Sequence, residues 1–191
     1  MAAAMTTTKI MIIRHAEKPP DSGEPFGVTA EGVQDVESLI IQGWQRAGAL
    51  ACFFAPAHGP LQDAELATPQ FLFASKSKSG GGSGRPVETI TPLASKLGLT
   101  PKTHKKSDID KVAADAMACG GTALICWQHE DIPSIANVIV GNHTTVPQEW
   151  PGDRFDVVWV FALGTSRNSY SFNQVPQCLL AGDSPDPIQD S

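Results

Sequence analysis

A short apolar run near the start of the chain ends on an arginine and a histidine. Residues 10–13 read Ile-Met-Ile-Ile, Arg14 and His15 follow directly, and prolines stand at positions 19 and 20. An unbroken apolar run of this length, rich in β-branched residues and followed by a breaker, indicates a strand buried on both faces. Such strands lie inside parallel α/β sheets, where ligands bind just beyond the carboxyl ends of the strands. We therefore expect Arg14 and His15 to stand at the mouth of a ligand site.

Similar apolar runs recur along the chain and alternate with helical patterns. The predicted strands are residues 10–13, 71–74, 122–127 and 155–162, with an edge strand at 170–175. The predicted helices are residues 29–48, extending as far as 54, and then 85–97, 107–119 and 132–140. This alternation predicts a mostly parallel sheet covered by helices on both faces, which is a three-layer α/β/α sandwich.

The first predicted helix depends on the spacing of its apolar residues. Thr29 is a residue type that favours an N-cap, and Val33, Val36, Leu39 and Trp44 follow at intervals that place them on one helical face. We therefore expect the helix to begin at Thr29 and to run to about Gly48.

Length and composition limit the classes of protein to which the chain can belong. Its 191 residues are enough for one domain with a substantial core. We expect a flexible extension over residues 1–8, a single domain over 9–181 and a disordered tail over 182–191. The net charge of −6 argues against nucleic acids and anionic membranes as general partners.

Neither the apolar runs nor the cysteines indicate a membrane or an oxidising compartment. No run approaches the roughly 18 apolar residues of a membrane span. The four cysteines are scattered without a Cys-x-x-Cys pair, so we expect free thiols rather than disulfides or a zinc site. Free thiols fit a reducing compartment, and we expect a cytoplasmic protein.

Two of the predicted strand ends carry a histidine. His15 follows the first strand beside Arg14, and His129 follows the strand at 122–127 beside Glu130. In a doubly wound sheet, both strand ends open into the same crevice. A single histidine of this kind is more often structural, but two at equivalent positions, each with a charged neighbour, favour a functional site.

These residues resemble a known family. Arg14-His15-Ala16 is similar to the Arg-His-Gly signature of the histidine phosphatase superfamily, which includes phosphoglycerate mutases and acid phosphatases. Further motifs follow in the family's order, namely Phe73-Ala74-Ser75, Arg85-Pro86-Val87-Glu88-Thr89, segments 92–94 and 97–99, and His129. The resemblance covers residues 9–140 and implies a histidine-phosphatase-like form of the α/β fold.

The resemblance also implies a nucleophilic mechanism. His15, as a neutral imidazole, would attack phosphorus to form a phosphohistidine, while Arg14 and Arg85 hold the phosphoryl oxygens. His129, as an imidazolium, would donate a further hydrogen bond, and water would then attack the phosphohistidine. No metal or other cofactor is required, because these cations supply the positive charge. The expected partner is a small phosphorylated substrate, and a homodimer is left open.

The group that protonates the leaving oxygen has several candidates. Glu130 follows His129, similar to the His-Asp pair of the acid-phosphatase branch, where the carboxyl has this role. In the mutase-like branch the acid follows the second arginine at a distance, which points to Asp108 or Asp110. Glu17 is a further carboxyl near the site. We rank Glu130 first.

Three further residues are assigned to substrate binding on the same resemblance. Lys18 takes the place of the third cation when residues 14–20 are aligned with the acid-phosphatase pattern Arg-His-Gly-x-Arg-x-Pro. Ser75 matches the serine after the family's second strand, and Glu17 adjoins the signature.

Two departures from the family pattern affect the expected site. Ala16 replaces the signature glycine, and a glycine-rich loop at 76–84, expected to be mobile, separates Ser75 from Arg85. The leading interpretation is a metal-independent phosphomonoester hydrolase. The alternatives are a phosphoglycerate-mutase-like phosphotransferase and a non-catalytic relative that binds a phosphorylated ligand or partner.

Overall fold

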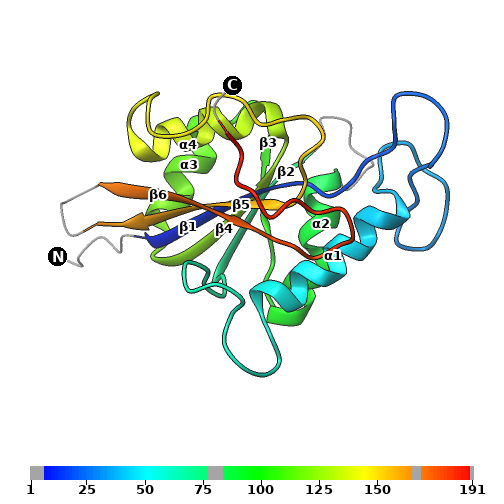
Figure 1. The fold of residues 1–191 in the computed structure, drawn as a ribbon, viewed down its shortest axis with the longest axis horizontal. Helices are drawn as coiled ribbons and strands as arrows, with labels where there is room; N and C mark the ends of the chain where they lie inside the picture. Colours follow the sequence, from blue (N-terminus) through cyan, green and yellow to red (C-terminus); the bar gives the residue numbers. More distant parts are fainter. Residues whose placement is uncertain (1–6, 77–83, 165–168, 190–191) are drawn as a thin grey trace.

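The computed structural model describes residues 7–76, 84–164 and 169–189, which form one six-stranded sheet with helices on both faces (Figure 1). The strand order across the sheet is β3-β2-β4-β1-β5-β6. The strands are β1 Thr7–Arg14, β2 Phe71–Lys76, β3 Lys102–Lys105, β4 Gly121–Trp127, β5 Val157–Leu163 and β6 Tyr170–Pro176. The helices are α1 Ile41–Phe54, α2 Arg85–Leu97, α3 Ile109–Ala118 and α4 Ile132–Val140, with a 3-10 turn at His129–Asp131.

Strand β1 shows why its apolar run is unbroken. Ile10 and Ile12 belong to the core cluster beneath α3 and α4, whereas Met11 and Ile13 belong to the cluster beneath α1 and α2. All four side chains are fully buried. Alternate side chains of a strand point to opposite faces, so a central strand between two helical layers needs apolar residues at every position. The predicted three-layer sandwich is confirmed.

The direction of the strands brings the predicted site residues to one edge of the sheet. Strands β3, β2, β4 and β1 are parallel, while β5 is antiparallel to β1 and β6 is antiparallel to β5. The carboxyl ends of the four parallel strands therefore meet at the same edge. Arg14, Lys76, Lys105 and Trp127 are the last residues of these strands.

The helix predicted from Thr29 is wrong before residue 41. Residues 15–40 form an irregular loop, and Val33 and Val36, expected on a buried helical face, are exposed. Tertiary partners take the backbone groups that a helix would have paired: Leu39 N donates to the buried carboxylate of Glu88, and Ile40 N donates to the carbonyl of Glu17. Tertiary contacts thus override a helical spacing of apolar residues.

Strand β3 was not predicted. Its segment is rich in lysine, but it pairs in parallel with β2, and His104 is buried, stacking on Phe73 with a centroid distance of 6.1 Å. Only one face of this edge strand is covered, so lysine can stand at positions 102, 105 and 106 around His104. The segment therefore lacks the apolar run by which a buried strand is predicted from sequence.

The ends of the chain also differ from expectation. Thr7 and Thr8 belong to β1, and the rest of the expected N-terminal extension lies outside the described residues. The prediction of a disordered tail is wrong for residues 182–189, because Ile188 is buried in the core and Asp183 pairs with Arg46. Most of the expected mobile loop at 76–84 lies outside the described residues.

The remaining sequence expectations concern thiols and the membrane. All four cysteines are free thiols, as predicted. Within residues 7–76, 84–164 and 169–189, no helix combines the length and the apolar character that crossing a bilayer requires.

Candidate active site

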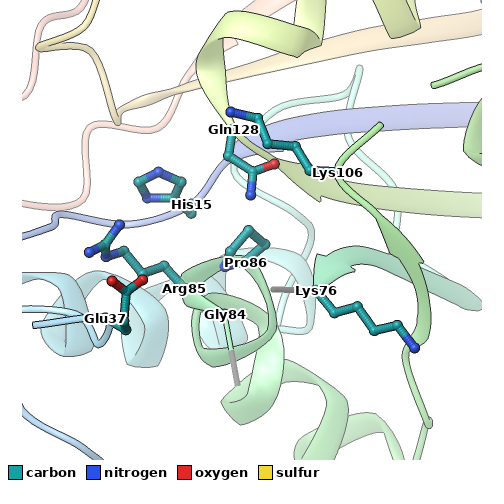
Figure 2. A pocket seen from close by; sticks show the side chains of 8 residues that line it. All are labelled: His15, Glu37, Lys76, Gly84, Arg85, Pro86, Lys106 and Gln128. Atoms are coloured by element: carbon teal, nitrogen blue, oxygen red, sulfur yellow. The ribbon is translucent and has the colours of Figure 1, made fainter. Parts of the chain in front are cut away.

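A cavity of about 400 Å³ opens at the carboxyl edge of the parallel strands. In Figure 2, His15, Arg85 and Glu37 lie on one side of the cavity, and Lys76 and Lys106 lie on the other. Gln128 completes the wall above Pro86 in that view. Segments far apart in the sequence thus converge on this cavity, whereas Arg14 and His129 are not among the residues that line it.

His15 is held in the orientation and protonation state of a nucleophile. Its backbone N donates to the carbonyl of Trp127 at 2.9 Å, which continues the β1–β4 ladder by one residue. Its Nδ1 lies 2.7 Å from the carbonyl of Ala16, so Nδ1 carries the proton and Nε2 keeps its lone pair. Burial, with the charges of Arg14 and Arg85, lowers the pKa of His15 to about 3. The imidazole is therefore neutral at ordinary pH.

The guanidinium of Arg14 is buried and only partly paired. Its Nη1 donates to the carbonyls of Gly152 at 2.7 Å and Arg154 at 3.0 Å, and the group lies over the ring of Phe155 at 3.7 Å. Burial lowers the pKa of Arg14 to about 10, which still leaves it charged. Its Nε and Nη2 find no hydrogen-bond acceptor within the described residues. These two nitrogens form the side of a guanidinium that binds two oxygens of one anion.

Arg85 stands at the first turn of α2, on the wall of the cavity. Its Nη2 donates to the carbonyl of Val36 at 2.7 Å, and its buried Nε has no acceptor among the residues that the structure describes. Thr89, one turn further along α2, accepts from Ala16 N at 2.8 Å and donates to the carbonyl of Arg85 at 2.7 Å. A single threonine therefore connects the His15 segment to Arg85.

His129 and Glu130 form a pair whose chemistry differs from the expectation. His129 Nδ1 lies 2.9 Å from Glu130 Oε2, and Lys106 Nζ donates to Glu130 Oε1 at 2.8 Å. Burial alone would raise the pKa of Glu130, but the hydrogen bond from Lys106 and the charge of His129 lower it to about 2. A carboxyl with so low a pKa is a poor proton donor near neutral pH, so the first-ranked acid does not suit that role.

The protonation state of His129 also differs from expectation. Burial, followed by the positive charge of Arg14, lowers the pKa of His129, whereas Glu130 raises it. The neutral form of the His129 imidazole is therefore favoured at neutral pH. An anion bound between Arg14 and His129 would favour its protonation.

Of the three residues predicted to bind substrate, Lys18 lies on the surface, whereas Glu17 and Ser75 are buried. Lys18 lies outside the cavity and pairs with Asp21 at 3.5 Å on the surface. Glu17 is buried, and its Oε1 accepts from Arg46 Nη2 at 2.7 Å and Nε at 2.9 Å. Ser75 is buried, and its Oγ donates to Gln128 Oε1 at 2.9 Å. The structure thus gives Glu17 an ion pair and Ser75 a partner in the cavity wall, rather than a direct approach to substrate.

The alternative acids Asp108 and Asp110 belong to α3. Asp108 is the N-cap residue of the helix, where its Oδ2 accepts from Lys105 N at 3.2 Å, and Asp110 lies in the first turn. Neither lines the cavity that contains His15. Their positions at the start of α3 fit a favourable interaction with the helix dipole.

Sequence reasoning missed several cavity residues. Lys106 follows the unpredicted strand β3, and Glu37 lies in the segment predicted as helix. Lys76 directly follows the Phe73-Ala74-Ser75 motif, and Gln128 directly precedes His129. For Lys76 and Gln128 a usable signal existed, because both stand at carboxyl ends of predicted parallel strands.

Comparison with known proteins identifies the fold. No family model matches the sequence, and a search of curated protein sequences finds no match. Among solved structures, a protein assigned as an alpha-ribazole-5'-P phosphatase from Escherichia coli aligns with a TM-score of 0.55 and 10% identity over 89% of this chain and 96% of its own.

Two further structures agree with the first. A protein assigned as the phosphohistidine phosphatase SixA from Agrobacterium tumefaciens gives a TM-score of 0.51 and 13% identity, over 88% of this chain and 96% of its own. A mycobacterial glucosyl-3-phosphoglycerate phosphatase gives a TM-score of 0.51 and 11% identity, over 88% of this chain and 97% of its own. The chain therefore has the fold of the histidine phosphatase superfamily.

Proposed function

We propose that the protein is a metal-independent phosphomonoester hydrolase that forms a phosphohistidine on His15. The observation that carries this proposal is the unpaired side of the Arg14 guanidinium, buried next to a neutral, oriented histidine. Leaving Nε and Nη2 of a charged group buried without acceptors costs free energy unless a ligand pairs with them. A phosphoryl group supplies oxygens for those nitrogens and an electrophile for His15. The shared fold supports the same class of reaction.

In the first step, Nε2 of His15 attacks phosphorus as the bond between phosphorus and the leaving oxygen breaks. The Ala16 carbonyl holds the proton on Nδ1, so the lone pair of Nε2 is available. Arg14 and Arg85 stabilise the charge on the non-bridging oxygens through nitrogens that are already fixed in place. These guanidinium groups are why no metal ion is required for this step.

The proton for the leaving oxygen comes from His129 rather than from Glu130. A phosphate dianion at Arg14 raises the pKa of the nearby His129, and the carboxylate of Glu130 favours the imidazolium from its other side. His129 then donates the proton and becomes neutral. Glu130 remains an anion throughout, because Lys106 holds it there.

In the second step, water attacks the phosphohistidine and neutral His129 accepts the proton of that water. The bond between phosphorus and Nε2 breaks, inorganic phosphate leaves, and both histidines return to their starting states. The two steps balance without any redox partner.

The test is hydrolysis of 4-nitrophenyl phosphate in the presence of EDTA. We expect the wild-type protein to turn over and His15→Asn to lose all measurable activity. The matched control is His58→Asn, because His58 is an exposed loop histidine. Wild-type protein that binds inorganic phosphate without hydrolysing any phosphomonoester would overturn the proposal in favour of a phospho-ligand-binding protein.

A further inference from the structure

A second hollow of about 290 Å³ adjoins the His15 cavity. Its lining includes Pro19, Pro20, Phe26 and Val36 from the loop between β1 and α1, together with Arg85. Lys18, Asp21 and Ser22 also line this hollow, so its apolar surface comes from Phe26, Val36 and the two prolines beside polar groups.

The two hollows share a wall. Arg85 lines both of them, and the neighbouring residues Val36 and Glu37 line one each. The Arg85 side chain is held at this boundary by its hydrogen bond to the Val36 carbonyl. A molecule whose phosphate lies at His15 and Arg85 can therefore extend its other end across Arg85 into the second hollow.

The loop that forms the second hollow is fixed by several contacts. Gly27 packs so closely that an added Cβ would lie 2.3 Å from the carbonyl oxygen of Asp35 and 3.1 Å from Cγ of Pro19. Val28 N donates to the Leu39 carbonyl at 2.8 Å, and Leu39 N donates to Glu88 of α2 at 2.9 Å. The hollow is thus a preformed feature of the fold.

Exposed apolar side chains gather on this same loop. Among the described residues, six large apolar side chains are exposed; Phe26, Val33 and Val36 lie on this loop, and Ile41 begins α1 directly after it. Phe26 and Val36 line the hollow, whereas Val33 does not. The charged residues Lys18 and Asp21, which also line the hollow, pair with each other at 3.5 Å and so offer little net charge. Exposed apolar surface beside a reactive site is typical of a ligand-binding surface.

We propose that this second hollow binds the leaving group of the substrate, and that the substrate is a phosphomonoester of an aromatic or other ring-bearing apolar alcohol. The proposal rests on the proposed hydrolase function. The phosphate is held at His15, Arg14 and Arg85, and the apolar ring packs against Phe26, Val36 and the prolines. A small polar alcohol such as glycerol leaves this surface unused.

The test compares two substrates across variants. We measure kcat/KM for 1-naphthyl phosphate and for glycerol 1-phosphate and take their ratio. The intrinsic difference in leaving-group reactivity is the same for every variant, so the ratio isolates contacts with the leaving group. We expect Phe26→Ser and Val36→Ser each to lower the ratio roughly fivefold or more. The matched control, Val33→Ser, removes an equally exposed apolar side chain of the same loop outside the hollow, and should leave the ratio unchanged.

A ratio that is unaffected in both Phe26→Ser and Val36→Ser, or that falls equally in Val33→Ser, would overturn the proposal. Phosphonates separate this failure from failure of the hydrolase function, because they bind without reacting. If the protein hydrolyses neither ester, the dissociation constants of methylphosphonate and 1-naphthylmethylphosphonate provide the ratio instead. Tighter binding of the naphthyl compound that disappears in Phe26→Ser supports the subsite, and equal binding of the two contradicts it.

Discussion

The pKa values of His15 and His129 are both lowered, but different neighbouring groups act on the two imidazoles. Burial, with the charges of Arg14 and Arg85, lowers the pKa of His15 to about 3. Burial and the charges of Arg14, Lys106 and Lys18 lower the pKa of His129, whereas the charge of Glu130 raises it, so its protonation depends on the balance of charge. Binding of a phosphate dianion shifts that balance toward the imidazolium. In the proposed mechanism, the bound substrate therefore promotes protonation of the donor, His129.

Substitution of Glu130 by glutamine tests this division of roles. Loss of the carboxylate should lower the pKa of His129 further, and each unit lowers its protonated fraction about tenfold above that pKa. We therefore expect the alkaline limb of the kcat profile to move to lower pH in Glu130→Gln. The exposed Glu149→Gln is the control. A loss of activity at every pH, with the alkaline limb unmoved, would instead identify Glu130 as the donor.

The elements position the site through close packing of α1 against the segment that follows β1. Gly43 of α1 leaves room for this segment, because an added Cβ would lie 2.5 Å from the carbonyl oxygen of Glu17 and 3.1 Å from its nitrogen. Glu17 is two residues from His15, so α1 fixes the backbone that holds the proposed nucleophile. The Ile40 N–H also donates to the Glu17 carbonyl just before the helix begins.

A pair of glycines on α1 gives a matched test of that packing. Gly43→Ala should destabilise the protein by roughly 1–3 kcal/mol, because backbone has to move, and should also lower kcat. Gly48→Ala meets no atom within 4 Å, and should stabilise the helix by about 0.5–1 kcal/mol. Urea unfolding monitored by circular dichroism measures both. Equal stability of the two variants would contradict the packing described here.

At the scale of helices, strands and loops, the sequence predicts strands better than loops. Strands β1, β2, β4 and β5 are visible because a central strand between two helical layers requires unbroken apolar residues. The edge strand β3 and the loop at 15–40 are not visible in this way. The loop depends on Glu88, which lies 49 residues from its partner Leu39. A sequence motif also locates His15, Arg14, Arg85 and His129, but not Lys106, whose role depends on β3.

The C-terminal segment takes part in a buried ion network with α1 and the segment after β1. Arg46 of α1 donates to Glu17 at 2.7 Å and to Asp183 at 2.7 Å, and all three side chains are buried. Gln177 accepts from the same guanidinium at 3.0 Å. The segment that the sequence predicted as disordered thus completes an ion network that reaches the residue two positions after the nucleophile. The polar composition of this segment does not reveal its place in the network, because the partner of Asp183 is Arg46, which lies far away in the sequence on α1.

Removing the charge of Asp183 should therefore weaken the whole fold. Breaking a buried ion pair costs about 3–5 kcal/mol, and we expect Asp183→Asn to approach this loss at pH 7, with the exposed Asp186→Asn unaffected. Burial alone would raise the pKa of Asp183, but hydrogen bonds from Arg46 and the Leu180 and Leu179 amides lower it. A lowered pKa stabilises the fold above the unfolded value of 3.8 and loses this effect as pH falls. The difference in stability between wild type and Asp183→Asn should therefore shrink below that pH.

The covalent intermediate is the central claim, and trapping it is the most direct measurement. Wild-type protein is mixed with a radiolabelled phosphomonoester, quenched in alkaline denaturant, where phosphohistidine survives, and digested for mass spectrometry. We predict label on the peptide that contains His15, and none in His15→Asn. Steady hydrolysis without any protein-bound label, or label on a residue other than His15, would contradict the account.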